Sequence, residues 1–284
     1  MVSKASQVDC ETMFQFTDSV FSPVQDANGN LFAVSSLGDV FKIVQEQGTY
    51  DVAFSTGGKP KGLVFDNQGS AFIADEALRA IMNKYDIENK NEQCYAAIKD
   101  FDGKELLGPN SMCLSEKNNL LFFTDSGPLE DCGLEKPNGS VYVIDLGVSM
   151  LKPVLQNCLA HPWGIAMNAE QNVIYVAETL RNRILRVIMH SSGAYYTSVF
   201  HQFAGGLGPS AITIDAKTGN LYVARFDHLE QKADGLVTVL SDEGEVQANL
   251  IVRNFPELTG LCFDSRPGKS DNLYATESAT NSFL

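Results

Sequence analysis

One sequence pattern recurs six times along the chain of 284 residues. Each copy consists of a short apolar run, a turn rich in Asp, Asn and Gly, and a second apolar run. Consecutive copies lie 40 to 53 residues apart when they are aligned on the residue that opens the turn, which is Asp26, Asp66, Ser115, Asn168, Asp215 and Asp264. A period of this length is typical of the blades of a β-propeller.

Further runs of alternating apolar residues follow the repeated pattern, such as DVFKIV at 39–44 and TYDVAFS at 49–55. Alternating Val, Ile, Tyr, Phe and Thr predict β-strands. Four strands in each of six copies predict an all-β fold, a six-bladed β-propeller of four-stranded antiparallel blades. We expect residues 1–284 to form this single domain, with blades at about 20–57, 58–107, 108–159, 160–207, 208–257 and 258–284.

The last copy is short, because only six residues follow the run LYATES at 273–278. Blade six then has at most three strands of its own. The N-terminal run ETMFQFTD at 11–18 is predicted to supply the missing outer strand. Pairing the two ends of the chain in one sheet would remove an exposed strand edge and close the ring.

The charge balance restricts the partners that the protein can bind. Asp and Glu number 35 against 21 Lys and Arg, which gives a net charge of −14. A surface of this charge repels nucleic acid and anionic lipid membranes, so we expect neither as a partner. Six cysteines are spread along the chain without a CxxC pair, and we expect them to be reduced thiols.

The ends of the chain carry weak targeting information. No apolar run reaches the ~18 residues of a membrane helix, and the first residues lack the hydrophobic stretch of a secretory signal, so we expect a cytoplasmic protein. The C-terminal residues Ser282, Phe283 and Leu284 only faintly resemble a peroxisomal or glycosomal targeting tripeptide, because the middle residue is not basic.

The innermost strand of each propeller blade lines the central channel, and the residue at which it starts faces the channel mouth. These mouth residues are predicted five positions before each turn, at Phe21, Lys61, Asn110, Trp163, Ser210 and Thr259. The loops between second and third strands open on the same face. They contribute mainly acids, among them Asp125, Glu178 and Glu277. The pattern predicts a ligand-binding pocket in an acidic channel mouth.

The motifs at the channel mouth resemble the senescence-marker-protein/gluconolactonase family and its strictosidine-synthase-like relatives. The matching stretches are FSPV at 21–24, GPNSM at 108–112, FFTDS at 122–126, HPWGIAMN at 161–168 and YVAETLRNRILRV at 175–187. This resemblance covers residues 20–280 and implies a propeller that binds or converts small molecules. In the lactonase branch it also implies a divalent cation, usually calcium, which oxygen ligands hold.

When the metal ligands that the resemblance implies are compared one by one with the residues of this chain, few of them are present. Phe21 stands where the family has its Glu, Trp163 where it has a second Asn, and Ser210 where it has its Asp, so Asn110 is the only retained ligand. Aromatic rings do not ligate calcium. We therefore expect no metal and no other cofactor. In the strictosidine-synthase-like branch a Glu of the last blade acts as acid or base, for which Glu277 and Glu257 are the nearest candidates.

Two hypotheses for the function follow. In the first, the protein is a metal-independent hydrolase of lactones or esters, or carries out strictosidine-synthase-like chemistry, with Lys61, Asn110 and His161 as the catalytic polar residues. Asn110 would donate to a developing oxyanion, while Phe21 and Trp163 would hold an apolar substrate. In the second, the propeller is not catalytic and binds a ligand or a protein through its acidic face. The fold alone does not choose between them.

Structural interpretations of the same residues stay open. Asp125 and Glu178 fit equally well as acceptors of hydrogen bonds from loop amides. Phe21 and Trp163 could instead fill the channel as core residues. We expect Lys61 to form an ion pair with a mouth carboxylate, because a buried unpaired charge is costly. The Asp residues that open the repeated turns are expected to shape those turns.

Overall fold

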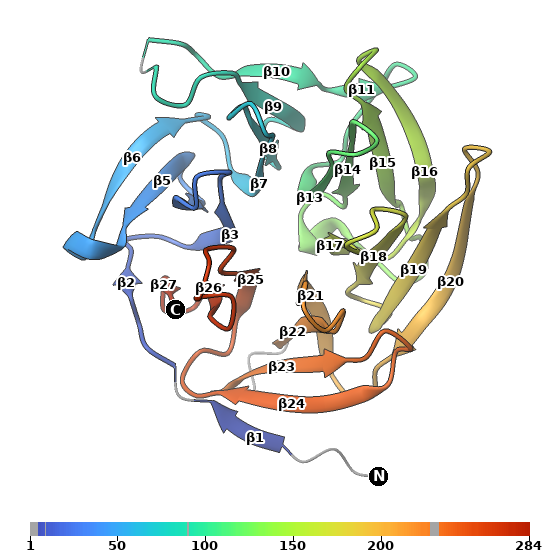
Figure 1. Ribbon diagram of the computed structural model, residues 1–284. Coiled ribbons are helices and arrows are strands. Elements are labelled where there is room, and N and C mark those ends of the chain that lie inside the picture. Colours follow the sequence, from blue (N-terminus) through green and yellow to red (C-terminus); the bar gives the residue numbers. More distant parts are fainter. Residues whose placement is uncertain (1–4, 9, 90, 228–232) are drawn as a thin grey trace.

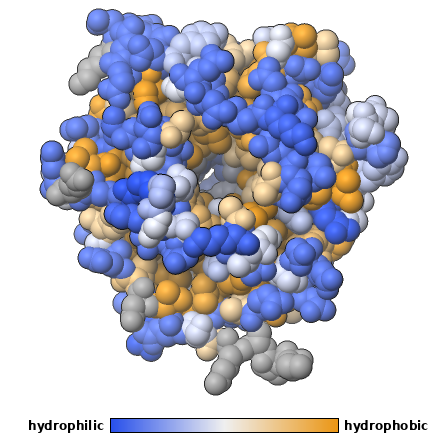
Figure 2. All heavy atoms as spheres, viewed as in Figure 1, coloured by the Kyte–Doolittle hydropathy of each residue, from blue (hydrophilic) through white to orange (hydrophobic). Residues whose placement is uncertain are grey.

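Six antiparallel sheets surround a central channel like the blades of a propeller (Figure 1). The structure, a computed structural model, describes residues 5–8, 10–89, 91–227 and 233–284. The blades have four strands that run from the channel to the rim in chain order, except that an N-terminal strand completes blade six and another adds a fifth strand to blade five. The predicted six-bladed propeller of four-stranded antiparallel blades is confirmed. The channel is visible as a hollow at the centre of the ring in Figure 2.

The strands of the first three blades follow the predicted repeat. Blade one contains β3 (Val20–Gln25), β4 (Leu31–Ser35), β5 (Asp39–Val44) and β6 (Thr49–Ser55). Blade two contains β7 (Pro60–Phe65), β8 (Ala71–Asp75), β9 (Ala80–Lys84) and β10 (Tyr95–Ile98). Blade three contains β13 (Pro109–Ser115), β14 (Leu120–Asp125), β15 (Gly139–Asp145) and β16 (Met150–Leu159).

The other three blades repeat this arrangement. Blade four contains β17 (Pro162–Met167), β18 (Val173–Glu178), β19 (Arg183–Met189) and β20 (Tyr195–Gln202). Blade five contains β21 (Leu207–Ile214), β22 (Leu221–Asp227), β23 (Gly235–Leu240) and β24 (Val246–Val252). Blade six contains β25 (Leu258–Phe263), β26 (Leu273–Glu277), β27 (Ser282–Phe283) and β2 (Phe14–Gln15).

Some elements lie outside the predicted repeat. Strand β1 (Ala5–Val8) pairs in parallel with β24 and adds a fifth strand to blade five. A small hairpin of β11 (Asp100–Phe101) and β12 (Lys104–Glu105) precedes blade three, and two 3-10 turns lie at η1 (Gln45–Gln47) and η2 (Leu129–Asp131). Among the described residues, no helix has the length and hydropathy needed to cross a membrane.

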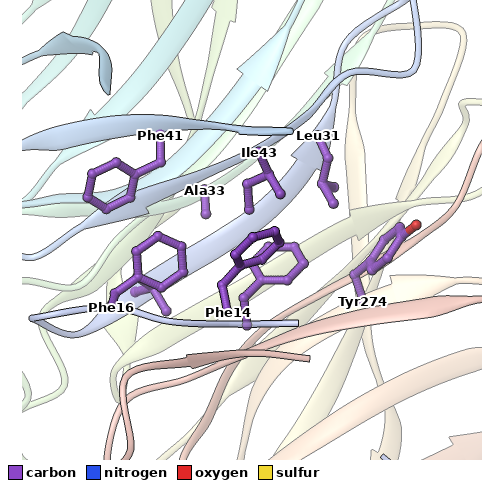
Figure 3. Close-up of a cluster of buried hydrophobic side chains, with 9 residues drawn as sticks. Phe14, Phe16, Leu31, Ala33, Phe41, Ile43 and Tyr274 are labelled. Carbon is purple, nitrogen blue, oxygen red and sulfur yellow. The ribbon is translucent and has the colours of Figure 1, made fainter. Parts of the chain in front are cut away.

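The ring closes through the N-terminal strand, as the sequence predicts. In blade six, β2 pairs with β27, so that Phe14 lies opposite Phe283. Figure 3 shows Phe14 and Phe16 facing the side chains of blade one, where the ring of Phe16 stacks on that of Phe41 with centroids 4.9 Å apart. Each of these buried aromatic side chains stabilises the closed ring by about 1.5–3 kcal/mol.

The core lies between blades and not in the centre of the ring. All five residues of β4 are buried, whereas the outer strand β6 is half exposed. The apolar clusters join neighbouring blades, as where Phe32 of blade one packs with Leu63 and Ile73 of blade two. This layered packing leaves the centre free for a channel.

Small residues allow the innermost strands to approach each other around the channel. A Cβ atom at Gly62 would lie 2.5 Å from the backbone oxygen of Asn110, and one at Gly164 would lie 2.3 Å from that of Ser210. The turns at the other end of these strands form as predicted. Oδ1 of Asp26 accepts hydrogen bonds from the amides of Asn28 and Asn30, at 2.9 and 2.8 Å.

Candidate functional site

Most of the predicted mouth residues lie where their innermost strand begins. Five of them are the second residue of their strand, namely Phe21 in β3, Lys61 in β7, Asn110 in β13, Trp163 in β17 and Thr259 in β25. In all six blades the register of the innermost strand shifts near this point. Such irregularities redirect side chains, so strict alternation does not tell which of them face the channel.

A cavity of about 180 Å³ lies in the channel beside four of these residues. Lys61, Asn110, Trp163 and Thr259 line it, together with Ser22, Ser111 and apolar residues of the innermost strands. Phe21 lies next to the cavity through its contact with Lys61. Ser210 is buried away from the cavity, and its Oγ donates a hydrogen bond to the carbonyl of Leu258 at 2.8 Å. The structure therefore brings five of the six predicted mouth residues together and assigns Ser210 to the contact between blades five and six.

Lys61 is the only basic side chain on the wall of this cavity among the described residues. Its Nζ lies 3.8 Å from the centroid of the Phe21 ring. The expected ion pair with a mouth carboxylate is wrong, because none of the ion pairs between described residues includes Lys61. Burial lowers the pKa of the Lys61 ammonium, and the charges of Glu76 and Glu130 only oppose this effect. A larger fraction of Lys61 is therefore in the neutral amine form than would be the case for an exposed lysine.

Asn110 and Thr259 are the neutral polar mouth residues that share the cavity with Lys61. The Nδ2 atom of the buried Asn110 donates to Oγ of Ser126 over 3.3 Å, a long hydrogen bond that a ligand oxygen can replace. The hydroxyl of Thr259 donates to the backbone oxygen of Val20 at 2.8 Å and so connects blade six with blade one. Asn110 is thus the donor that is best placed to meet a bound molecule.

His161 stands behind the aromatic wall of the cavity. Its ring packs edge-on against Trp163 with centroids 5.6 Å apart, and its Nδ1 lies 3.3 Å from Sγ of Cys132. Burial and the neighbouring acids Asp131 and Glu130 raise the pKa of Cys132 to about 11, so this thiol stays protonated near neutral pH. His161 does not line the cavity. The contact with Cys132 was missed because the loop that carries this cysteine contains no recognisable motif.

The acidic residues of the mouth have a different role from the predicted ligand-binding one. Each is the last residue of the second strand of its blade, at most 2% exposed, and accepts a backbone amide that precedes the innermost strand of the same blade. We call them the loop-capping carboxylates. They are Asp75, which accepts from Lys59 at 2.9 Å, Asp125 from Gly108 at 2.8 Å, Glu178 from Ala160 at 2.8 Å, and Glu277 from Glu257 at 2.9 Å.

None of the loop-capping carboxylates lines the channel cavity. Glu178 additionally holds Arg181 and Arg183 at 3.0 and 2.6 Å. Burial raises the pKa of Asp125, and the two loop amides that it binds oppose this. The alternative interpretation of Asp125 and Glu178 as amide acceptors is therefore the one that the structure shows, and these buried acids do not form an exposed acidic surface.

The residues at the channel mouth do not fit a calcium ion. The resemblance places a carboxylate at position 21, but the structure has a phenyl ring there with the ammonium group of Lys61 above it. The hydroxyl of Ser210 donates a hydrogen bond to the carbonyl of Leu258. Among the described residues, no group of three or more His, Cys, Asp or Glu gathers into a metal site. Calcium needs six to eight oxygen ligands, and Asn110 supplies one. That the protein works without a metal stays a prediction.

Comparisons with known proteins agree with this fold. A sequence model described as "SMP-30/Gluconolactonase/LRE-like region" matches residues 22–279. Lactonase drp35 of Staphylococcus epidermidis is 28% identical over 141 residues, which are 48% of this chain and 41% of that protein. The match thus spans less than half the length of this relative.

Solved structures show the same architecture at low sequence identity. A gluconolactonase from Xanthomonas campestris superimposes with a TM-score of 0.76 at 20% identity, over 96% of this chain and 86% of the other. A calcium-binding protein, regucalcin, from Agrobacterium tumefaciens gives a TM-score of 0.76 at 17% identity, over 94% and 85% of the two chains. At this level of identity the likeness extends to the fold alone.

Proposed function

The chain belongs to the SMP-30/gluconolactonase/LRE-like family, and from this premise we propose that its channel cavity hydrolyses small lactones or esters without a metal ion. The observation that carries the proposal is the amine of Lys61, which lies in the same cavity as the amide of Asn110. This amine has a lowered pKa and no ion-pair partner in the described part of the chain. The lactonase activity of the staphylococcal relative supports the reaction class.

The proposed reaction uses Lys61 as the base. The neutral amine takes a proton from a water molecule as the water oxygen attacks the acyl carbon of the substrate. The lowered pKa favours this step, because general-base catalysis near neutral pH needs an unprotonated group. When the acyl carbon–oxygen bond breaks, the resulting ammonium returns the proton to the leaving alkoxide, so the amine is regenerated.

Asn110 stabilises the negative charge that develops on the acyl oxygen. Its Nδ2 exchanges the long hydrogen bond to Ser126 for one to the oxyanion. Trp163 and the apolar walls of the cavity hold the rest of the substrate, whose acyl part has to be small to fit about 180 Å³. We assign His161 a positioning role, because its ring packs against Trp163 and it is not on the cavity wall.

A panel of lactones and phenyl esters, assayed in the presence of a chelator, tests this proposal. We expect Lys61→Met to lower kcat/KM by at least ~100-fold and Asn110→Ala by ~100-fold, as is typical for the loss of a base and of an oxyanion donor. Lys59→Met is the matched control, because this exposed lysine lies two residues away and outside the cavity. Added calcium should not increase the rate.

Activity that is unchanged in Lys61→Met would refute the role of this lysine. A wild-type protein that hydrolyses none of these substrates would refute the hydrolase proposal itself. In that case, titration of the same esters shows whether the cavity binds them without turnover, which is the outcome that the non-catalytic hypothesis predicts.

A further inference from the structure

Blade five departs from the rule of the loop-capping carboxylates. In blade three Pro109 pairs with Asp125, and in blade four Pro162 pairs with Glu178. At the same point of blade five, Pro209 pairs with Arg225. A base therefore occupies the position that holds an acid in four other blades.

The guanidinium of Arg225 contacts only neutral groups. Its Nη2 donates to the backbone carbonyl of Leu207 and, at 3.0 Å, to Oδ1 of Asn182. Its central carbon lies 3.7 Å from the centroid of the Phe203 ring. Nε has no hydrogen-bond partner, and none of the ion pairs between described residues includes Arg225. Part of the donor capacity of this guanidinium is unused.

The charge of Arg225 is buried, and no acid among the described residues balances it. The side chain is only 5% exposed. Burial lowers the pKa of Arg225 to about 10, and no carboxylate in the described part of the chain opposes this. The group is still protonated at neutral pH. A buried charge without a counter-charge is unfavourable, and proteins keep such groups where a ligand supplies the opposite charge or where the fold has no alternative.

A second cavity, of about 540 Å³, lies against Arg225 and separate from the channel. Its walls are mostly apolar and come from the chain before β21 and from the outer strands β23 and β24, with Phe203, Leu236, Val246 and Ile251 among them. Asp234 also lies on the wall, but it accepts a hydrogen bond from the amide of Asn254 at 3.0 Å and does not pair with Arg225. The volume is in the range of small-molecule sites.

We propose that this cavity binds a small monocarboxylate with an apolar chain. The carboxylate lies on the guanidinium of Arg225, whose planar donors match its geometry, and the chain extends over Leu236, Val246 and Ile251. A single negative charge balances the single positive one. The wall also carries the polar side chains of His201, Thr238 and Asn249, but Nδ1 of His201 lies 2.7 Å from the carbonyl of Gly244 and the hydroxyl of Thr238 donates to Asn249. A single guanidinium therefore matches a carboxylate better than a dianion such as phosphate. This site is independent of the reaction proposed for the channel.

Calorimetric titration at neutral pH with octanoate, and with octanamide as its uncharged counterpart, tests the site. We expect octanoate to bind at least ~10-fold more tightly than octanamide, because a charged hydrogen bond contributes more than a neutral one. Arg225→Gln should lower the affinity for octanoate by at least ~10-fold and remove its preference over octanamide. The matched control Arg79→Gln removes an exposed arginine that is paired with Glu105, and should leave the affinity unchanged.

A second variant keeps the proposal testable where Arg225→Gln does not fold. Leu236→Trp fills the cavity but keeps the guanidinium, and it should abolish octanoate binding. Equal binding of octanoate and octanamide by the wild-type protein, no binding of either at millimolar concentration, or unchanged octanoate binding in a folded Leu236→Trp variant would each overturn the proposal. Lys61→Met should bind octanoate like the wild type, which separates this site from the channel cavity.

Discussion

Four blades of the propeller and blade five fix the same loop with side chains of opposite charge. In blades two, three, four and six a buried carboxylate accepts the amide that precedes the innermost strand. In blade five Arg225 donates to a carbonyl at that point. The carboxylates are surrounded by donors, whereas the guanidinium keeps an unused donor beside a cavity. Burial of a charge therefore does not by itself mark a binding site, and our proposal for Arg225 rests on its unpartnered Nε together with the adjacent cavity.

Two lysines of blade two, the buried Lys84 and the partly buried Lys61, show the same contrast. Nζ of Lys84 donates to the carbonyls of Asn89 and Glu92, at 2.9 and 2.8 Å, and lies 3.7 Å from the carboxylate of Glu92. Lys61 has no such partner among the described residues and lies on the wall of the channel cavity. We therefore interpret Lys84 as a structural residue and Lys61 as part of the proposed site in the channel cavity.

The largest effect is expected from Glu178→Ala in blade four. This change leaves the amide of Ala160 and two arginines without their acceptor, so the free energy of unfolding should fall by about 3–5 kcal/mol. Urea unfolding measures it. Glu178→Gln, which keeps one acceptor oxygen, should lose less. A loss below about 1 kcal/mol for the alanine variant would show that the loop-capping carboxylates are not structural.

A smaller effect is expected from Arg225→Met in blade five. The variant loses the hydrogen bonds to Leu207 and Asn182, but it also removes a buried charge that no described acid balances. These effects oppose each other, and apolar replacement of buried charges is often close to neutral, so stability should change by less than about 1 kcal/mol. If the same unfolding experiment showed a loss as large as that of Glu178→Ala, Arg225 would be a structural residue like the carboxylates.

The smallest expected effect is the change in the free energy of unfolding with pH that Lys61 causes. Because burial lowers its pKa in the folded state, the folded protein loses this proton at a lower pH than the unfolded chain does. Stability should therefore rise with pH as it approaches the ordinary lysine value of about 10.4. Comparing the wild type with Lys61→Met by urea unfolding from pH 7 to 10 isolates this contribution. If the contribution of Lys61 to stability instead grew as the pH fell, its pKa would be raised in the folded state, which would indicate an acidic partner.

The repeat predicted more of the fold than of the site. The spacing of the turns predicted the blades, and the short last copy predicted the closure through Phe14, because strand periodicity and chain length are properties of the sequence itself. Strand β1 was missed because its pairing with β24 is a tertiary contact without a local pattern. The contact of Cys132 with His161 was missed for the same reason.

Side-chain direction limited the prediction of the site. The sequence placed Lys61, Asn110 and Trp163 at the channel, but it could not distinguish them from Ser210, because the register shifts at the start of each innermost strand redirect the side chains. It also left the role of Asp125 and Glu178 open, since an acid that faces a ligand and one that faces a loop amide occupy the same position in the repeat.

We propose that Lys61, and not an acid of the mouth, is the general base of the reaction in the channel. This proposal is tested most directly by measuring kcat/KM for phenyl acetate, with a chelator present, in Lys61→Met and Glu277→Gln. Glutamine keeps one acceptor oxygen for the loop amides that Glu277 binds, but its NH2 group faces the donors of the second oxygen, so urea unfolding first establishes that the variant is folded. We predict a loss of at least ~100-fold in Lys61→Met and an activity close to that of the wild type in Glu277→Gln. The reverse pattern, with Glu277→Gln inactive and Lys61→Met active, would contradict the account.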